Sequence, residues 1–232
     1  MMNGTAVIGT GGLRKLRRPY LRQRYTILFY TLLLTMVAAP VFDALEFPGV
    51  LIESLLAANL LAAVLPVSDR RGRSVLLALM FLVWLARSAI AWLEHPALSA
   101  MTLGIWTVIG LLAAALALRF AMRAASVDAE HLYAALSAYL LAGIFFGLFY
   151  WVLEQSWPGT FTFAGKFSRV SALYFSFVTL ATLGYGDIVP RTDIARGLAI
   201  VEGVGGQLFL AVMVARLVSL YGRGSREQDR RT

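Results

Sequence analysis

Glycines at alternate positions set apart one short stretch of the chain, Thr182-Leu183-Gly184-Tyr185-Gly186-Asp187. Glycine reaches backbone conformations that a side chain forbids, so this alternation lets successive carbonyl groups turn to one side of an extended strand. Four such strands around an axis form a column of oxygen atoms that replaces the water shell of a potassium ion. The stretch therefore predicts coordination of a dehydrated cation by backbone carbonyl groups.

The segments on either side of this stretch indicate how it is held. Residues 169–181 are apolar and aromatic but too short to cross a membrane, whereas residues 132–153 and 193–221 are long enough. Irregular backbone at membrane depth is tolerated only where protein buries it or water lines it. The pattern predicts a spanning helix, a re-entrant half-helix followed by an irregular loop, and a second spanning helix.

Together these features resemble the pore unit of the potassium-channel superfamily, and the resemblance covers roughly residues 129–221. The usual filter pattern of that family has Val where this chain has Leu183, a residue whose carbonyl rather than side chain faces the ion. The resemblance implies a homotetramer that binds permeant K⁺ ions and no other cofactor. It implies a selectivity filter formed by residues 182–186, which ends at Gly186. K⁺ is expected at the carbonyls of the first four residues: Thr182, Leu183, Gly184 and Tyr185.

The resemblance also implies roles for residues around the filter. Asp187 forms a ring of carboxylates at the outer mouth and raises the local concentration of cations. Relatives tie this aspartate to a tryptophan of the pore helix, and Tyr174 and Phe175 stand at the matching positions here, so the Tyr174 hydroxyl is the expected replacement. In the last helix the resemblance implies a gating hinge at Gly206 and a cavity-lining face formed by Gln207, Leu210 and Val214.

Glu202 is an acidic residue inside the last apolar segment. It precedes Gln207 by five residues, which at about 100° per residue turns it some 140° away from the cavity face. A carboxylate at that depth is costly unless it is paired or protonated. Its possible partners are Ser176, Thr179 and Arg169. A purely structural hydrogen bond and support of the filter that depends on protonation both remain open.

Composition limits the class of protein. The chain has 232 residues, of which 59% are hydrophobic and only 15% charged, with a mean hydropathy of +0.72; soluble domains carry roughly 25% charged residues. This predicts an integral membrane protein in the lipid bilayer. It contains no cysteine and no visible grouping of nucleophile and base or of metal ligands, so we expect no enzyme.

Apolar runs of helical length predict six transmembrane helices, over residues 25–42, 49–65, 74–93, 98–118, 132–153 and 193–221. The expected fold is an all-α integral membrane protein with a re-entrant pore helix and filter between helices five and six. The first run could instead belong to a signal peptide, although Pro40 after the cleavage-like residues disfavours cleavage.

The net charge of +8 does not indicate a nucleic-acid partner, because most basic residues cluster in short segments at helix ends. With both termini cytoplasmic, most of the 21 Lys and Arg residues lie on the cytoplasmic side of a multi-pass protein of the cell membrane. The predicted domains are a cytoplasmic basic tail (1–24), a four-helix transmembrane domain (25–123), the pore domain (124–221) and a cytoplasmic tail (222–232).

The first four helices show the layout of a voltage-gated channel without its sensing charges. Residues 98–118 contain no charged residue, and Arg119 and Arg123 follow at the end of that run, whereas a sensor carries several basic residues through the field. Glu53 and Arg87 lie at similar depths and form a possible structural ion pair. We expect a potassium-selective channel that voltage does not gate; the alternatives are a weakly selective cation channel or a non-conducting modulatory subunit.

Overall fold

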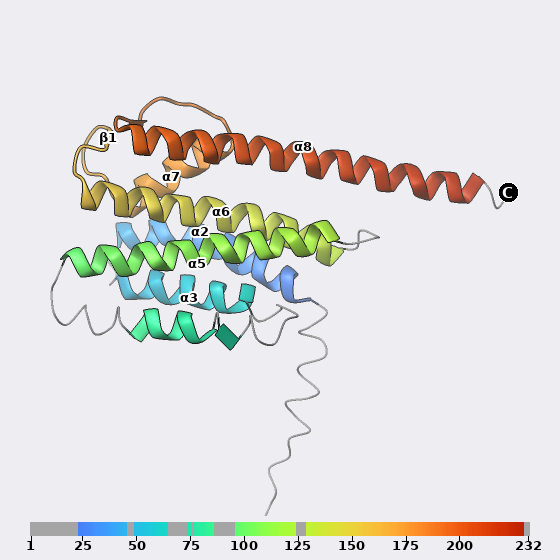
Figure 1. Cartoon of the computed structure of the whole chain (residues 1–232), viewed down its shortest axis with the longest axis horizontal. Helices are drawn as coiled ribbons and strands as arrows, with labels where there is room; N and C mark the ends of the chain where they lie inside the picture. The colour runs from blue at the N-terminus through green and yellow to red at the C-terminus, as the bar shows by residue number, and fades with distance from the viewer. Residues whose placement is uncertain are drawn as a thin grey trace, which may run out of the picture.

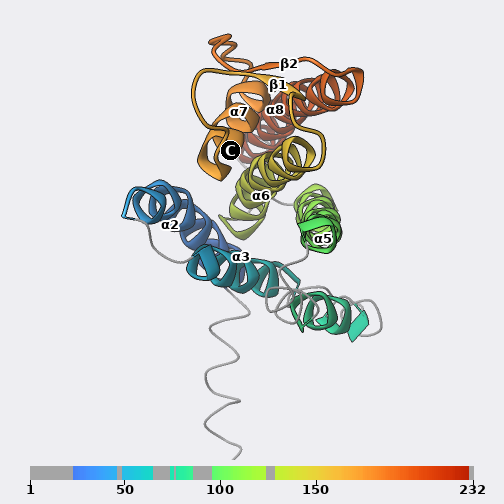
Figure 2. The same cartoon turned by 90° about the vertical axis from the view of Figure 1, so that its left-hand side faces the viewer.

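The computed structural model describes residues 23–45, 49–64, 74–75, 77–85, 96–123 and 129–229. In these residues five long helices lie roughly side by side, and a short helix is inclined between the last two (Figures 1 and 2); residues 74–75 and 77–85 are helical as well. The long helices are α2 (Arg24–Ala44), α3 (Gly49–Val64), α5 (Pro96–Arg123), α6 (Ala129–Ser156) and α8 (Asp193–Asp229), and the short one is α7 (Arg169–Leu180).

Four helices of the described part of the chain are long and apolar enough to cross a membrane: Arg24–Phe42, Thr102–Met122, Ala129–Ser156 and Asp193–Arg216. The expectation of a helical membrane protein is confirmed at this level. The count of six spanning helices stays a prediction, because α3 has 16 residues and the third expected helix is described as helical only at residues 74–75 and 77–85.

Three expectations fall wholly or partly outside what the structure describes. Residues 1–22 and 230–232 of the two tails are not described, and neither are the side chain of Glu53 and residue Arg87, so the proposed ion pair is untested. Two helices continue well past their expected ends: α5 reaches Arg123 instead of residue 118, and α8 reaches Asp229 instead of residue 221. The extension of α8 is the longer one. Its last turns contain Arg, Glu and Gln, whose helix propensity is favourable enough to outweigh two glycines.

The centre of the bundle is the contact between α5 and α6, which are separated only by residues 124–128. A Cβ atom at Gly110 of α5 would lie 2.3 Å from the ring of Phe145, a fully buried residue of α6. Small buried residues continue this contact along both helices: Ala113, Ala114, Ala117 and Ala121 in α5, and Ala134, Ala135 and Ala138 in α6. Small side chains let helices in membranes approach closely and gain dispersion energy.

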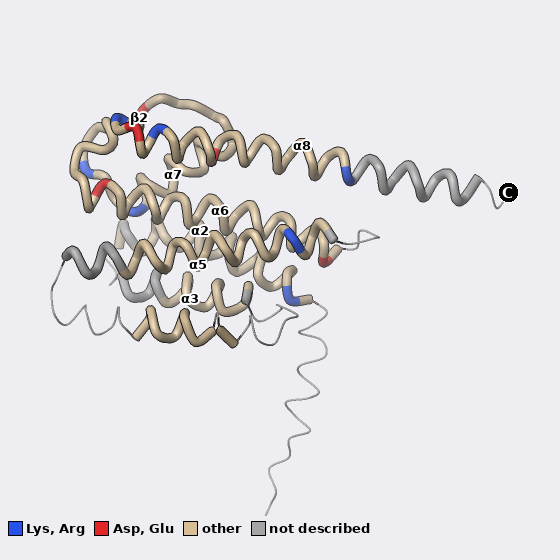
Figure 3. The backbone as a smooth tube through the Cα atoms, viewed as in Figure 1, with Lys and Arg blue, Asp and Glu red and all other residues tan. Residues whose placement is uncertain are grey.

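Acidic and basic residues of the described chain lie mostly toward the helix ends (Figure 3). At one end, Glu130 of α6 accepts hydrogen bonds from the Tyr25 backbone N–H (3.1 Å) and the Thr26 hydroxyl (3.0 Å). The first N–H groups of a helix have no partner within the helix and favour a negative charge. Glu130 therefore stabilises the start of α2 and fixes it against α6.

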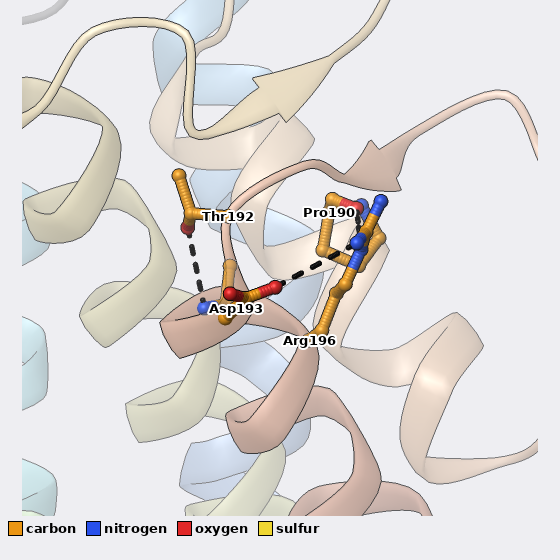
Figure 4. A network of polar contacts seen from close by, with 5 residues as sticks. Pro190, Thr192, Asp193 and Arg196 are labelled. Atoms are coloured by element: carbon orange, nitrogen blue, oxygen red, sulfur yellow. Dashed lines mark hydrogen bonds and ion pairs between the residues drawn. The ribbon is translucent and has the colours of Figure 1, made fainter.

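The start of α8 is fixed by a local polar network, shown in Figure 4. The Thr192 hydroxyl accepts a hydrogen bond from the Ala195 N–H (3.4 Å), and the Arg196 guanidinium donates to the Pro190 carbonyl (3.3 Å). Arg196 also lies 3.7 Å from the Asp193 carboxylate. These contacts hold the strand that precedes α8 in line with the first turn of the helix.

Candidate functional site

The glycine-containing stretch begins directly at the end of α7. Ser168 caps the start of α7 by accepting a hydrogen bond from the Ser171 N–H, and the Ser171 hydroxyl bonds back to the Ser168 N–H. At the other end the backbone N–H groups of Thr182 and Leu183 donate to the carbonyls of Thr179 (3.0 Å) and Val178 (2.9 Å). The first residues of the stretch are therefore attached to the last turn of the helix.

Backbone angles then alternate along the stretch. The φ angles of Thr182, Gly184 and Gly186 are 55°, 63° and 78°, in the left-handed region, whereas Leu183 and Tyr185 have negative φ. Alternation of this kind turns successive peptide planes so that their carbonyl groups can face one side. Thr182 is the only non-glycine residue of the described chain with positive φ, and a conformation that costs a β-branched residue energy often marks a functional site.

Gln207 connects α8 to the first residue of this stretch, because its side-chain amide donates to the Thr182 hydroxyl at 3.2 Å. Leu210 and Val214 lie further along α8 and are 43% and 58% exposed in the single chain. The expected cavity-lining face is thus an uncovered face of α8, and its first residue touches the glycine-containing stretch.

Gly206 marks the closest approach between α8 and the end of α7. A Cβ atom at this position would lie 2.4 Å from the Leu180 carbonyl oxygen and 3.0 Å from its Cδ1 atom. α8 remains helical through Gly206. The structure therefore gives this glycine a packing role that the sequence did not indicate, and the hinge role stays a prediction.

Two tyrosines and an aspartate lie at the other end of the stretch. The rings of Tyr174 and Tyr185 stack with their centroids 6.2 Å apart and their planes 4° from parallel. Burial, followed by the hydrogen bond to Asp187 and its negative charge, raises the pKa of the Tyr174 hydroxyl. The structure thus brings Tyr174 to Asp187, whereas Phe175 points into the core, with its ring 5.0 Å from that of Tyr150.

A short two-stranded sheet holds the chain that leaves the stretch. Strand β1 (Phe161–Thr162) pairs antiparallel with β2 (Val189–Pro190), and the Arg191 N–H donates to the Thr160 carbonyl at 2.8 Å. The buried Glu154 carboxylate at the end of α6 accepts from the N–H groups of Gly159 (2.9 Å) and Phe161 (3.0 Å). The sequence analysis did not predict this role of Glu154. The feature that could have indicated it is an acidic residue at the end of an apolar helix, just before a Gly-containing loop.

Glu202 lies behind the stretch, on the side of α8 turned away from Gln207. It is 1% exposed, accepts a hydrogen bond from the Tyr150 hydroxyl at 2.7 Å, and contacts the Ser176 hydroxyl. Ser176 was one of the expected partners, whereas Tyr150 was not expected. The Arg169 guanidinium, another expected partner, lies over the ring of Trp151 at 4.6 Å.

Residues 135–223, which include α7, the glycine-containing stretch and most of α8, match a family model described as "Ion channel". This segment is therefore similar to that ion-channel family. The match begins inside α6, so it covers the site and the helices that hold it and leaves α2, α3 and α5 outside. This match, together with four helices long and apolar enough to cross a membrane, indicates a membrane protein.

Known proteins with similar sequences carry the words potassium channel in their names. The chain is 50% identical over 50 residues to Two-pore potassium channel 4 of Arabidopsis thaliana, which is 22% of this chain and 18% of the relative. It is 34% identical over 89 residues to the Inward rectifier potassium channel Kirbac3.1 of Paramagnetospirillum magnetotacticum, 37% of this chain and 28% of the relative. Probable potassium channel protein 2 of Methanocaldococcus jannaschii is 41% identical over 51 residues, 21% and 15% of the two chains.

The matched part of the chain thus spans less than a third of the length of each of these relatives. No solved structure shows a significant match to the chain. The resemblance to the potassium-channel superfamily is confirmed by the family model and the relatives, whereas the roles of individual residues stay predictions.

Proposed function

We propose that the chain is the pore subunit of a homotetrameric channel that conducts K⁺ selectively and passively across the cell membrane. The observation that carries the proposal is the alternation of left-handed φ angles at Thr182, Gly184 and Gly186. It occurs directly after a short helix, within the segment that matches the ion-channel family model. This is the backbone conformation needed for a row of carbonyl ligands from residues 182–185.

One chain supplies only part of an ion's coordination shell, so the proposal requires several copies around an axis. The glycine-containing stretch and a row of apolar residues on α8 are exposed in the single chain: Ile200, Val201, Val204 and Leu208 are 65%, 62%, 54% and 61% exposed. Apolar side chains on a helix that also bears the Gln207–Thr182 contact fit an interface between subunits around the pore. Four copies would also form the ring of Asp187 carboxylates at the outer mouth.

Within this proposal the chain crosses the membrane six times, with α7 as a re-entrant pore helix and both termini in the cytoplasm. The support is the distribution of basic residues over the sequence and the direction of α7. The carbonyl end of α7, which carries the negative end of the helix dipole, leads directly into the glycine-containing stretch and favours a cation there.

We further propose that membrane voltage does not gate the channel. The charged residues of α5 are Arg119 and Arg123, both in its last turns. The remainder of the helix packs closely against α6, where Gly110 meets Phe145. A helix without charges in its body has nothing for the transmembrane field to move, since moving one elementary charge through 100 mV is worth roughly 2.3 kcal/mol.

The test is reconstitution of the purified full-length chain into liposomes loaded with K⁺ and diluted into Na⁺ medium, with the reverse gradient as the matched arm. We expect K⁺ efflux with much smaller Na⁺ flux and, in planar bilayers, an open probability that changes little with voltage. Comparable fluxes of both ions would identify a weakly selective cation channel, which Leu183 in place of the family's Val would explain. A folded tetramer that passes neither ion would be a non-conducting subunit and would overturn the proposal.

A further inference from the structure

Among the described residues, Glu202 is the one acidic residue whose buried side chain connects three helices. It extends from α8, lies beside Tyr150 of α6 and Ser176 of α7, and is 1% exposed. None of these residues belongs to the row of ion ligands. The cluster of these three side chains, which we name the Glu202 cluster, lies behind the filter.

The number of hydrogen atoms in this cluster indicates its protonation state. The Ser176 hydroxyl lies 2.7 Å from the Gly143 carbonyl of α6 and also contacts a carboxyl oxygen of Glu202. A serine hydroxyl carries one hydrogen, and a carbonyl can only accept. If Ser176 donates to Gly143, the hydrogen between Ser176 and Glu202 must come from Glu202. The other carboxyl oxygen then accepts from the Tyr150 hydroxyl at 2.7 Å.

A neutral Glu202 therefore satisfies every contact in the cluster, whereas an ionised one does not. Without its proton, Glu202 can only accept, and Ser176 must choose between the carboxylate and Gly143. The ionisable groups near Glu202 on α6 are Tyr150, which donates a hydrogen bond to it, and the neutral phenol of Tyr139. The polar group that contacts it from α7 is Ser176. Neutral hydroxyl groups compensate a buried negative charge less well than a cation does.

Loss of the Ser176–Gly143 bond would act on the filter through α7. The same helix supplies the Val178 and Thr179 carbonyls that hold the N–H groups of Leu183 and Thr182. Ser176 lies less than one helical turn before them, so a shift of this turn changes the position of the first filter carbonyls. Nearby, a Cβ atom at Gly147 would lie 2.8 Å from Leu173 Cα, so α6 and α7 have little room to adjust by sliding past one another.

We propose that Glu202 is a positioning residue which, as a neutral carboxylic acid, donates to Ser176, accepts from Tyr150 and so holds α7 in the conducting position. When the proton leaves to water, Ser176 turns to the carboxylate, its bond to α6 is lost, and K⁺ conduction falls. This inference rests on the proposed function, and it adds a dependence on pH in which alkaline conditions reduce the current.

Two substitutions distinguish the effect of the Glu202 proton from the effect of side-chain packing in the cluster. Glu202→Gln places an NH₂ group that can donate to Ser176 and a carbonyl that can accept from Tyr150, so it reproduces the neutral state without a titrating proton. Ser176→Ala removes the link between Glu202 and Gly143 and leaves the carboxylic acid in place. Gly205→Ala, at a position of α8 where a Cβ atom meets nothing within 4 Å, serves as the control for a change in the same helix.

The experiment measures K⁺ flux from liposomes at a series of pH values for the full-length chain and these variants, with tetramer content checked by size. We expect wild type and Gly205→Ala to lose roughly tenfold in flux from acid to alkaline pH, the scale of one buried hydrogen bond. Glu202→Gln should stay near the acid level at every pH, and Ser176→Ala near the alkaline level. Identical pH responses of wild type and Glu202→Gln would overturn the proposal.

An infrared measurement on the purified tetramer gives a readout that does not depend on conduction. We expect the carbonyl stretching band of a protonated carboxylic acid in wild type, lost on alkaline titration and absent from Glu202→Gln at every pH. A wild-type spectrum without that band would overturn the inference even if K⁺ flux is normal. The band together with an absence of any K⁺ flux would instead leave the neutral Glu202 in place and contradict the proposed function.

Discussion

The two sides of α6 are held together in different ways. On the side of α7 and α8, buried polar groups bond in fixed directions, as in the Glu202 cluster and in the Glu154 carboxylate that binds two backbone N–H groups. On the side of α2, α3 and α5, apolar residues fill most of the contact, and the hydrogen bonds that Glu130 accepts hold only the start of α2. The buried contact between side chains that joins α2 to α3 there is the hydrogen bond from Asn59 to Thr35.

This difference shows what each region must achieve. Close packing of small residues sets how near two helices lie, whereas a hydrogen bond also fixes the direction in which two groups face each other. A row of carbonyl ligands works only while its geometry is held, so the directional contacts lie where the ion pathway is proposed. The family match likewise covers the side of α7 and α8 and begins within α6.

The largest effect is expected at the filter itself. Gly184→Ala places a side chain on a residue with φ of 63°, a strain of roughly 1–2 kcal/mol in each subunit, so that the backbone leaves the ligand geometry. We expect K⁺ flux to fall to background while the tetramer survives. Gly197→Ala is the matched control, because its backbone is not left-handed and a Cβ atom there meets nothing within 4 Å.

Undiminished, selective K⁺ flux in Gly184→Ala would contradict the assignment of the filter. A loss of flux in both variants, by contrast, would mean that the assay responds to any added methyl group in this region. The comparison therefore needs the two variants measured at equal tetramer content.

The next effect is expected where α8 meets α7. Gly206→Ala drives a methyl group to 2.4 Å from the Leu180 carbonyl, and overpacking of this kind costs about 1–3 kcal/mol. We expect a large fall in K⁺ flux together with a lower melting temperature. Gly205→Ala lies one residue away in open space and should retain both. If Gly206→Ala keeps full stability and alters only the opening rate, the hinge role is favoured over the packing role.

The sequence allowed the helices and the glycine-containing stretch to be predicted, because both depend on local patterns of apolar residues and glycines. It also predicted that Glu202 lies on the side of α8 turned away from Gln207, since the angle between residues of one helix follows from their spacing. Tyr150 could not be predicted as its partner, because the two residues are 52 positions apart in the chain. The role of Glu154 and the packing of Gly206 likewise depend on how separate elements meet.

A smaller effect is expected at the contact between the two regions. Arg216 of α8 donates to the Ala121 carbonyl in the last turn of α5, where helix carbonyls lack partners and favour a positive charge. Arg216→Ala should loosen this turn by about 1 kcal/mol, giving roughly fivefold faster amide exchange at residues 119–123. Arg216→Lys keeps the charge and should exchange at an intermediate rate. Equal exchange in all three proteins would show that the contact contributes nothing to the stability of α5.

The smallest effect is expected on the side of α2, α3 and α5, at the hydrogen bond of 2.7 Å from the Asn59 amide to the Thr35 hydroxyl. Hydrogen bonds between membrane helices contribute on average about 0.6 kcal/mol, so Asn59→Leu should lower the unfolding free energy in detergent only slightly. In a double-mutant cycle with Thr35→Val, a coupling energy of about that size would assign the loss to the bond itself.

The K⁺ flux of Asn59→Leu tests the contrast between the two sides of α6 more directly than its stability does. If α2 and α3 support the pore only through close packing, K⁺ flux and its dependence on pH should equal those of wild type, because the contacts that hold α7 are unchanged. Flux is to be measured on the same preparation as the stability, so that a loss of folded protein is corrected for. A fall in K⁺ flux larger than the fall in folded tetramer would break the contrast between the two regions. The bond between α2 and α3 would then be coupled to the ion pathway, and α6 would transmit changes from one side to the other.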